Sequence, residues 1–160
     1  MRVRRLISKE KITDSAGQWS AKDLQPRYAP IYSKTKPIRA GWQWRSSRVV
    51  AAGEIYILLA ECNPGRGNWN AKLIRETDEG FSVVARLESH ASHPGLHVHA
   101  HCKRGGIETG ATGLDNLVRI PPIGAPHRRT NAWTEATFWE AAKRFFHVRE
   151  EQGVLDLNAP

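Results

Sequence analysis

The chain has 160 residues, 40% of them hydrophobic and six of them tryptophan, a composition typical of one globular domain rather than of a disordered chain. Its 24 Lys and Arg exceed its 16 Asp and Glu by eight, and this positive charge indicates an anionic partner. The sequence holds no run of about 20 apolar residues, and its start lacks the apolar stretch of a secretory signal, so we expect a cytoplasmic protein without a membrane partner.

The positive charge is concentrated at the start of the chain. Residues 1–48 contain 12 of the 24 Lys and Arg against three acids, a net charge of +9, whereas the rest of the chain carries −1. A cationic segment releases counterions when it meets a phosphate backbone, which makes nucleic acid the leading partner. An anionic membrane surface, an acidic protein and a merely solubilising arm remain the alternatives.

Residues 1–46 show no sustained hydrophobic period and contain three prolines, so we predict a basic, partly ordered N-terminal arm. Its aromatic residues can stack on unpaired bases, or they can pin the arm against the rest of the protein. We favour pinning for most of them, because tryptophan buries a large apolar area. The candidate nucleic-acid-binding residues are Arg2, Arg4, Arg5, Arg39, Trp42, Trp44, Arg45 and Arg48.

From Ser47 the sequence changes to short β-type runs separated by turn residues, which predicts an antiparallel meander of about four strands over residues 47–102. The apolar run at residues 49–60 indicates one central strand with a bulge at Gly53. Turn residues at 63–68, 78–80 and 92–95 then separate the following strands.

The last predicted element is a helix at residues 134–152, with Thr134 as its N-cap and Gly153 as its stop. Phe138, Phe145 and Phe146 share one side of this helix, and we expect them to cover one face of the sheet. The fold class is therefore α+β, with a single domain at residues 47–160 behind the arm at residues 1–46.

Five of the seven histidines lie within residues 90–101. His97, His99 and His101 alternate with apolar residues, so a strand places them on one face, about 6.6 Å apart and pointing away from the core. Neutral imidazole is both a proton acceptor near neutral pH and a common metal ligand. This ladder of histidines is the leading candidate site.

The first hypothesis for the ladder is metal-independent cleavage of RNA, which needs no cofactor. One imidazole takes the proton of a ribose 2′-hydroxyl, a second protonates the leaving oxygen, and a cation stabilises the charge on phosphorus. RNA is favoured over DNA because it carries its own nucleophile. The candidate catalytic residues are His97, His99, His101, Lys103 and Arg104, with Arg86 and Arg75 as other available cations.

The second hypothesis is a hydrolase that depends on zinc or another metal and uses the same histidines. Two imidazoles of an H-x-H pair supply two ligands, and a third comes from a neighbouring strand or turn. The candidate third ligands are Glu88, His90, His93 and Cys102, and the full alternative set is His93, His97, His99 and His101. Geometry separates the hypotheses, because metal ligands must converge on one point whereas an acid/base pair need only flank a positive groove.

A third hypothesis is a nucleic-acid-binding protein without catalysis, in which the histidines are incidental. His127 and His147 are separate from the ladder and are taken as incidental under all three hypotheses.

The stretch His90-Ala-Ser-His-Pro-Gly-Leu-His97-Val-His99, on a small basic chain with a meander and a closing helix, resembles histidine-rich segments of some small toxins of bacterial toxin–antitoxin pairs. The resemblance covers about a dozen residues, and the basic arm here is longer than in compact members. It implies a cytoplasmic ribonuclease-like effector that a partner protein neutralises.

Overall fold

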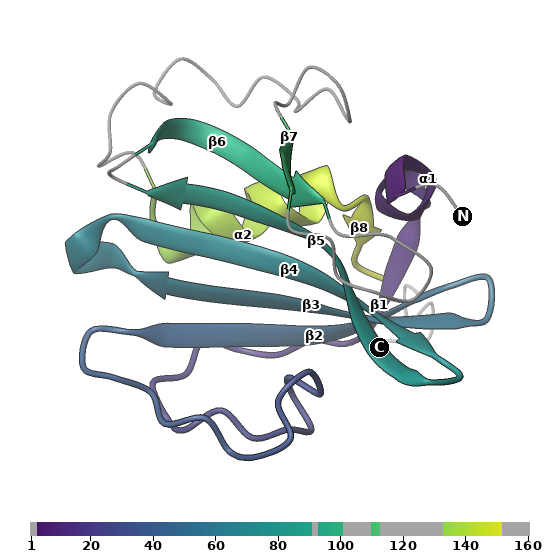
Figure 1. Ribbon diagram of the computed structural model, residues 1–160, viewed down its shortest axis with the longest axis horizontal. Coiled ribbons are helices and arrows are strands. Elements are labelled where there is room, and N and C mark those ends of the chain that lie inside the picture. The colour runs from purple at the N-terminus through teal and green to yellow at the C-terminus, as the bar shows by residue number, and fades with distance from the viewer. Residues whose placement is uncertain (1–2, 91–92, 101–109, 113–132, 152–160) are drawn as a thin grey trace, which may run out of the picture.

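The computed structural model describes residues 3–90, 93–100, 110–112 and 133–151 (Figure 1). These residues form one eight-stranded sheet, in the order β7-β6-β5-β4-β3-β2-β1-β8, with the helix α2 on one face. The elements are α1 (Val3–Ser8), β1 (Lys11–Ser15), β2 (Gln43–Ala51), β3 (Glu54–Asn63), the 3₁₀ turn η1 (Pro64–Arg66), β4 (Asn68–Thr77), β5 (Gly80–His90), β6 (His93–Ala100), β7 (Gly110–Thr112), α2 (Glu135–Phe145) and β8 (Val148–Arg149).

The predicted meander is confirmed, but the predicted number of four strands is wrong. From β2 to β7 each strand pairs antiparallel with the next one along the chain. The sheet then continues past β2 with β1, and β8 pairs parallel to β1 at the edge. The sheet is therefore mixed, and it is larger than the local sequence pattern indicates.

The apolar run at residues 49–60 is a hairpin rather than one bulged strand. Ala52 and Gly53 have φ values of 48° and 79°, and two consecutive residues with positive φ form the tight turn that best joins twisted antiparallel strands. Val50 consequently pairs with Ile55. The prediction of a central strand holds for β3, which lies inside the sheet and is buried from Tyr56 to its end.

The N-terminal arm belongs to the sheet and to its cores, so the prediction that the sheet begins at Ser47 is wrong. Strand β1 lies between β2 and β8, and Leu6 and Ile7 of α1 are buried in the main core. The loop between β1 and β2 runs beside β2, where its residues Leu24 and Ala29 are fully buried (Figure 1). This supports pinning as the role of the arm's apolar residues.

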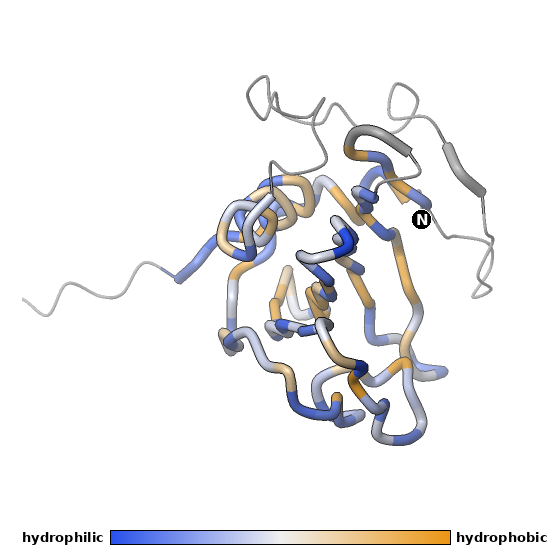
Figure 2. Tube along the Cα trace, turned by 90° about the vertical axis from the view of Figure 1, so that its left-hand side faces the viewer, coloured by the Kyte–Doolittle hydropathy of each residue, from blue (hydrophilic) through white to orange (hydrophobic). Residues whose placement is uncertain are grey.

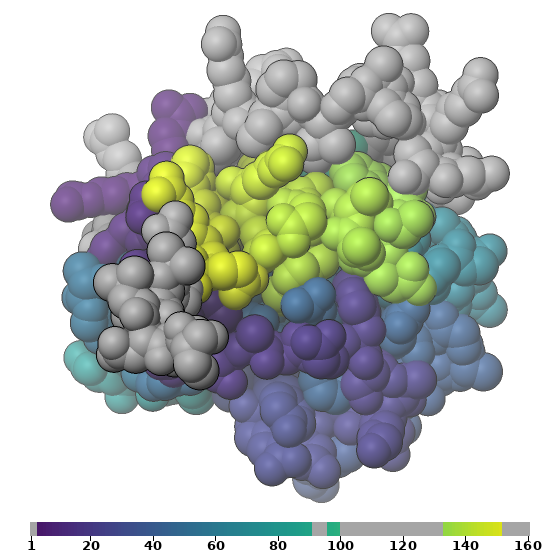
Figure 3. Space-filling view, turned by 180° about the vertical axis from the view of Figure 1, so that it is seen from behind, coloured from purple at the N-terminus to yellow at the C-terminus, as the bar shows by residue number. Residues whose placement is uncertain are grey.

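Helix α2 begins as predicted and ends earlier than predicted. The Thr134 hydroxyl accepts a hydrogen bond from the amide of Thr137, and the Thr137 hydroxyl bonds back to the Thr134 amide. The helix ends at Phe145 rather than at 152, because His147 has a left-handed backbone with φ of 54° and β8 follows directly. Seen from behind, α2 lies over the middle of the molecule, and residues of the N-terminal arm lie below it (Figure 3).

Two apolar clusters lie on opposite faces of the sheet. The larger joins α2, including Phe138, to inward side chains such as Leu58 and Leu87. The smaller lies on the other face, where the arm contributes Leu24. Hydrophobic residues lie mainly along the strands and α2, and the turns are mostly hydrophilic (Figure 2). Among the described residues, no helix has the length and apolarity needed to cross a membrane.

Candidate metal centre on the outer face of the sheet

We call the face turned away from α2 the outer face. On β6, Leu96 and Val98 are buried in the main core, whereas the side chains of His97 and His99 are 24% and 22% exposed. Because successive strand residues point to opposite faces, both imidazoles lie on the outer face. The predicted orientation of the ladder is confirmed for these two histidines, and His101 lies outside the described residues.

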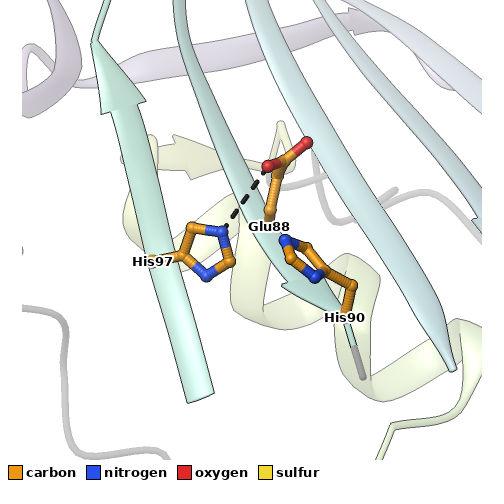
Figure 4. A group of neighbouring side chains, drawn as sticks. All are labelled: Glu88, His90 and His97. Carbon is orange, nitrogen blue, oxygen red and sulfur yellow. Dashed lines mark ion pairs between the residues drawn. The ribbon is translucent and has the colours of Figure 1, made fainter. Parts of the chain in front are cut away.

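The side chains of Glu88, His90 and His97 converge on the outer face. Glu88 and His90 lie two residues apart on β5, and Glu88 pairs directly with His97 of β6. One possible ligand atom from each residue lies within 4.8 Å of the other two. Figure 4 shows the three side chains pointing toward one another in front of the two strands. Glu88 and His90 are two of the four candidate third ligands named from the sequence.

The Glu88 carboxylate is the centre of this group. Its Oε2 lies 3.0 Å from Nε2 of His99 and 3.6 Å from Nε2 of His97. Its Oε1 lies 2.7 Å from Nε of Arg86. The imidazole rings are also adjacent, with His97 centred 4.9 Å from His90 and 5.2 Å from His99. The Glu88 carboxylate thus contacts Arg86 and His99 and lies close to His97.

The electrostatic surroundings favour a neutral His99. Burial lowers its pKa and is the largest cause, and the charges of Arg86 and His97 act in the same direction. Glu88 opposes these effects without overcoming them. Neutral imidazole is the form that accepts a proton or binds a metal.

The convergent group is a ligand set that metal ions use. Two imidazoles and one carboxylate, with a water at the fourth position, form a known type of catalytic zinc site. Ligand atoms about 2.1 Å from one ion lie about 3.0 to 3.4 Å from each other, so ligand atoms within 4.8 Å of one another need only small side-chain movements to surround it.

The structure places the other predicted site residues as follows. His93 lies in β6 with its backbone opposite His90, and Lys103 and Arg104 lie outside the described residues, as does Cys102. The remaining histidine on a described segment, His147, lies next to β8, at the opposite edge of the strand order.

The predicted nucleic-acid-binding residues do not form one surface. Arg45 stacks on Trp139 of α2, with its guanidinium carbon 4.4 Å from the ring centre, and Arg48 pairs with Asp14. Trp44 is 7% exposed and packs beside Tyr28. Arg4 and Arg5 lie on α1, Arg2 lies outside the described residues, and Arg39 and Trp42 line one pocket.

Sequence reasoning missed a buried carboxylate on the same face. Glu61 of β3 is 5% exposed, and its two oxygens lie 2.6 Å from Nζ of Lys36 and 2.7 Å from Nζ of Lys72. Burial alone raises the pKa of Glu61, but the two ammonium groups outweigh burial and lower it. The available signal was an acid directly after the apolar run at residues 55–60.

Comparisons of the chain with models of protein families, with curated proteins and with solved structures find no match. The resemblance to toxin segments therefore stays a prediction.

Proposed function

We propose that this protein is a metal-dependent hydrolase in which Glu88, His90 and His97 hold a zinc ion. The observation that carries the proposal is the convergence of these three side chains from two adjacent strands. Convergence is the criterion that separates a metal site from an acid/base pair, and it favours the metal hypothesis over the metal-independent one.

Zinc held by three protein ligands leaves a position for water and lowers the pKa of that water toward neutrality. Hydrolysis by this water changes no oxidation state and needs no oxidant or reductant. The water oxygen would form a bond to the electrophilic atom of the substrate, the bond to the leaving oxygen would break, and the proton lost by the water would pass to the leaving oxygen. Arg86, in contact with Glu88, supplies a positive charge beside the site for an anionic substrate such as a phosphodiester.

His99 has a supporting position in this scheme. Its Nε2 contacts Glu88, while the ligand group of mutually close atoms consists of Glu88, His90 and His97. A partner that fixes the orientation of a ligating carboxylate tunes the affinity of a metal site. We therefore assign His99 as a positioning residue for Glu88.

Metal-independent RNA cleavage is the second candidate, and the contact between Glu88 and His99 favours it. A carboxylate 3.0 Å from Nε2 orients an imidazole and stabilises its protonated form, as it does for a histidine that acts as a general base. His97, whose ring is centred 5.2 Å from that of His99, is then the second imidazole, and Arg86 is the cation.

The deciding experiment measures zinc content and RNA cleavage of the purified chain with and without a chelator. We expect one zinc per chain and cleavage that a chelator abolishes and added zinc restores. Glu88→Gln removes both properties, whereas the matched control Glu79→Gln, at an exposed turn, leaves both unchanged. Cleavage that persists in chelator and disappears in His99→Ala contradicts the metal proposal and supports the second candidate.

A further inference from the structure

A pocket of about 490 Å³ lies beside the outer face, between the arm and the turn that follows β3. Trp42 and Ile38 give it an apolar wall, and both side chains are half-buried. Lys36, Arg39 and Arg66 supply three cations, and the buried Glu61 is also a lining residue. Only two of the predicted nucleic-acid-binding residues, Arg39 and Trp42, are among those that line it.

The pocket carries uncompensated positive charge. Its one carboxylate, Glu61, is already engaged by Lys36 and by Lys72 of β4. Arg39 and Arg66 are exposed and have no ion-pair partner among the described residues. Two free guanidinium groups beside an aromatic side chain suit a ligand with a planar ring and anionic oxygens. Nucleotides have both features.

The pocket and the proposed metal centre are connected along one row of the sheet. Glu61 pairs with Asn70 of β4, and Asn70 pairs with Glu88 of β5. Directly paired residues share a face, so Glu61 and Glu88 both lie on the outer face, two strand spacings or about 10 Å apart. In the neighbouring row Lys72 pairs with Arg86, so these two cations, which contact Glu61 and Glu88 respectively, lie on the outer face beside the row that joins the pocket to the centre.

We propose that the pocket at Arg39, Trp42 and Arg66 is a nucleotide subsite that holds a single-stranded nucleic acid whose chain continues across Lys72 and Arg86 to the metal centre. The delivery of a phosphodiester to the centre rests on the proposed function, but the binding of the strand does not. A base stacks on Trp42 only when it is unpaired, which favours a single strand over a duplex.

The test measures binding of a fluorescein-labelled single-stranded oligonucleotide to the full chain by fluorescence anisotropy, across a series of salt concentrations. All variants carry Glu88→Gln and His99→Ala, so neither candidate reaction cleaves the strand and a failed metal proposal leaves the result intact. Trp42→Ala should weaken binding roughly 5- to 100-fold, the loss expected for one stacked base, whereas Trp42→Phe should retain most of the affinity. Circular dichroism checks that each variant is folded.

Arg39→Ala and Arg66→Ala should each reduce the slope of log affinity against log salt by about 0.7, because each removes one contact to a phosphate of the single strand. Lys34→Ala is the matched control, since Lys34 is an exposed cation of the same loop outside the pocket lining. It should leave the slope unchanged.

Binding is measured for an RNA strand and a DNA strand of the same sequence, and for the duplex of each. Binding of either single strand that responds to Trp42→Ala supports the proposal. Tighter binding of a duplex, or single-strand affinity within twofold of the parent in Trp42→Ala, overturns it.

Discussion

The two faces of the sheet differ in what their side chains do. The inner face packs against α2 and carries the larger apolar cluster, with Leu58, Leu73 and Leu87 fully buried. The outer face is apolar only where the arm covers β2 to β4, and over β5 and β6 it carries Glu88 and the histidines. Leu87 and Glu88 are neighbours in sequence, yet one belongs to the core and the other to the candidate site. Substitutions on the inner face should therefore change stability, whereas substitutions on the outer face should change the proposed metal binding.

The largest expected effect tests the inner face. Phe138 of α2 is fully buried and packs beside Trp69, with ring centres 5.5 Å apart. Phe138→Ala should reduce the free energy of unfolding by about 3 to 5 kcal/mol, because it removes apolar contact and leaves a cavity. Urea denaturation measures the loss. If zinc affinity of the folded variant falls as well, the two faces are not independent.

The next effect tests the outer face. His97→Ala should reduce zinc affinity at least about 100-fold, or about 2.7 kcal/mol, since loss of a supporting partner alone costs 10- to 100-fold. The metal-free variant should unfold within about 0.5 kcal/mol of the parent, because the side chain is partly exposed and outside both cores.

Isothermal titration with zinc and urea denaturation supply these two values. His147→Asn is the matched control, because Asn tolerates the left-handed backbone at this position and should leave zinc affinity unchanged. Equal zinc affinity in His97→Ala and the parent would contradict the proposal that His97 binds zinc on the outer face.

The stability of the protein should depend on pH through Lys11, a cation that is buried on the inner face. The Nζ of Lys11 donates to the carbonyl oxygens of Ile7, Lys9 and Phe146, and so ties α1 and β1 to the end of α2. Burial is the largest cause that lowers its pKa from 10.5 to about 7. Above pH 7 the unfolded chain therefore binds one more proton here than the folded chain.

Stability should consequently rise with pH, by about 1.4 kcal/mol per unit at most, from pH 7 to pH 9. Above that window the buried thiol of Cys62, whose pKa is raised to about 12 chiefly by burial, begins to act in the opposite direction. Lys11→Met should abolish the slope in urea denaturation at successive pH values. An unchanged slope in Lys11→Met would assign the pH dependence to other groups.

The smallest expected effect concerns the start of α2. Thr134→Ala removes the side chain that accepts from the Thr137 amide and should cost about 1 kcal/mol of unfolding free energy. Thr35→Ala, at an exposed position of the arm, serves as the control. A cost as large as that of Phe138→Ala would mean that the cap contributes as much as the core that the helix buries.

The local part of this architecture could be predicted from sequence. Alternation at residues 96–99 assigned Leu96 and Val98 to the core and His97 and His99 to the other face, because strand period alone decides it. The requirement for a third ligand from a neighbouring strand or turn likewise included Glu88 and His90 among four candidates. Thr134 was identified as the N-cap from residue type alone.

The non-local part could not be predicted. Strand β1 has a polar sequence and pairs with residues far along the chain, Val49 on one side and Val148 on the other. The turn at Ala52 and Gly53 lies within an apolar run, so the sequence pattern predicts one strand there instead of two. Glu61 meets Lys36 only because the arm folds back on the sheet.

X-ray absorption spectroscopy at the zinc edge, on the full chain loaded with one equivalent of zinc, identifies the ligands of the proposed metal centre. We expect only nitrogen and oxygen ligands, at about 2.0 to 2.2 Å, with the outer-shell scattering of two imidazoles that disappears in part in His97→Ala. Sulfur at about 2.3 Å, or a chain that retains no zinc after loading, would contradict a metal centre at Glu88, His90 and His97.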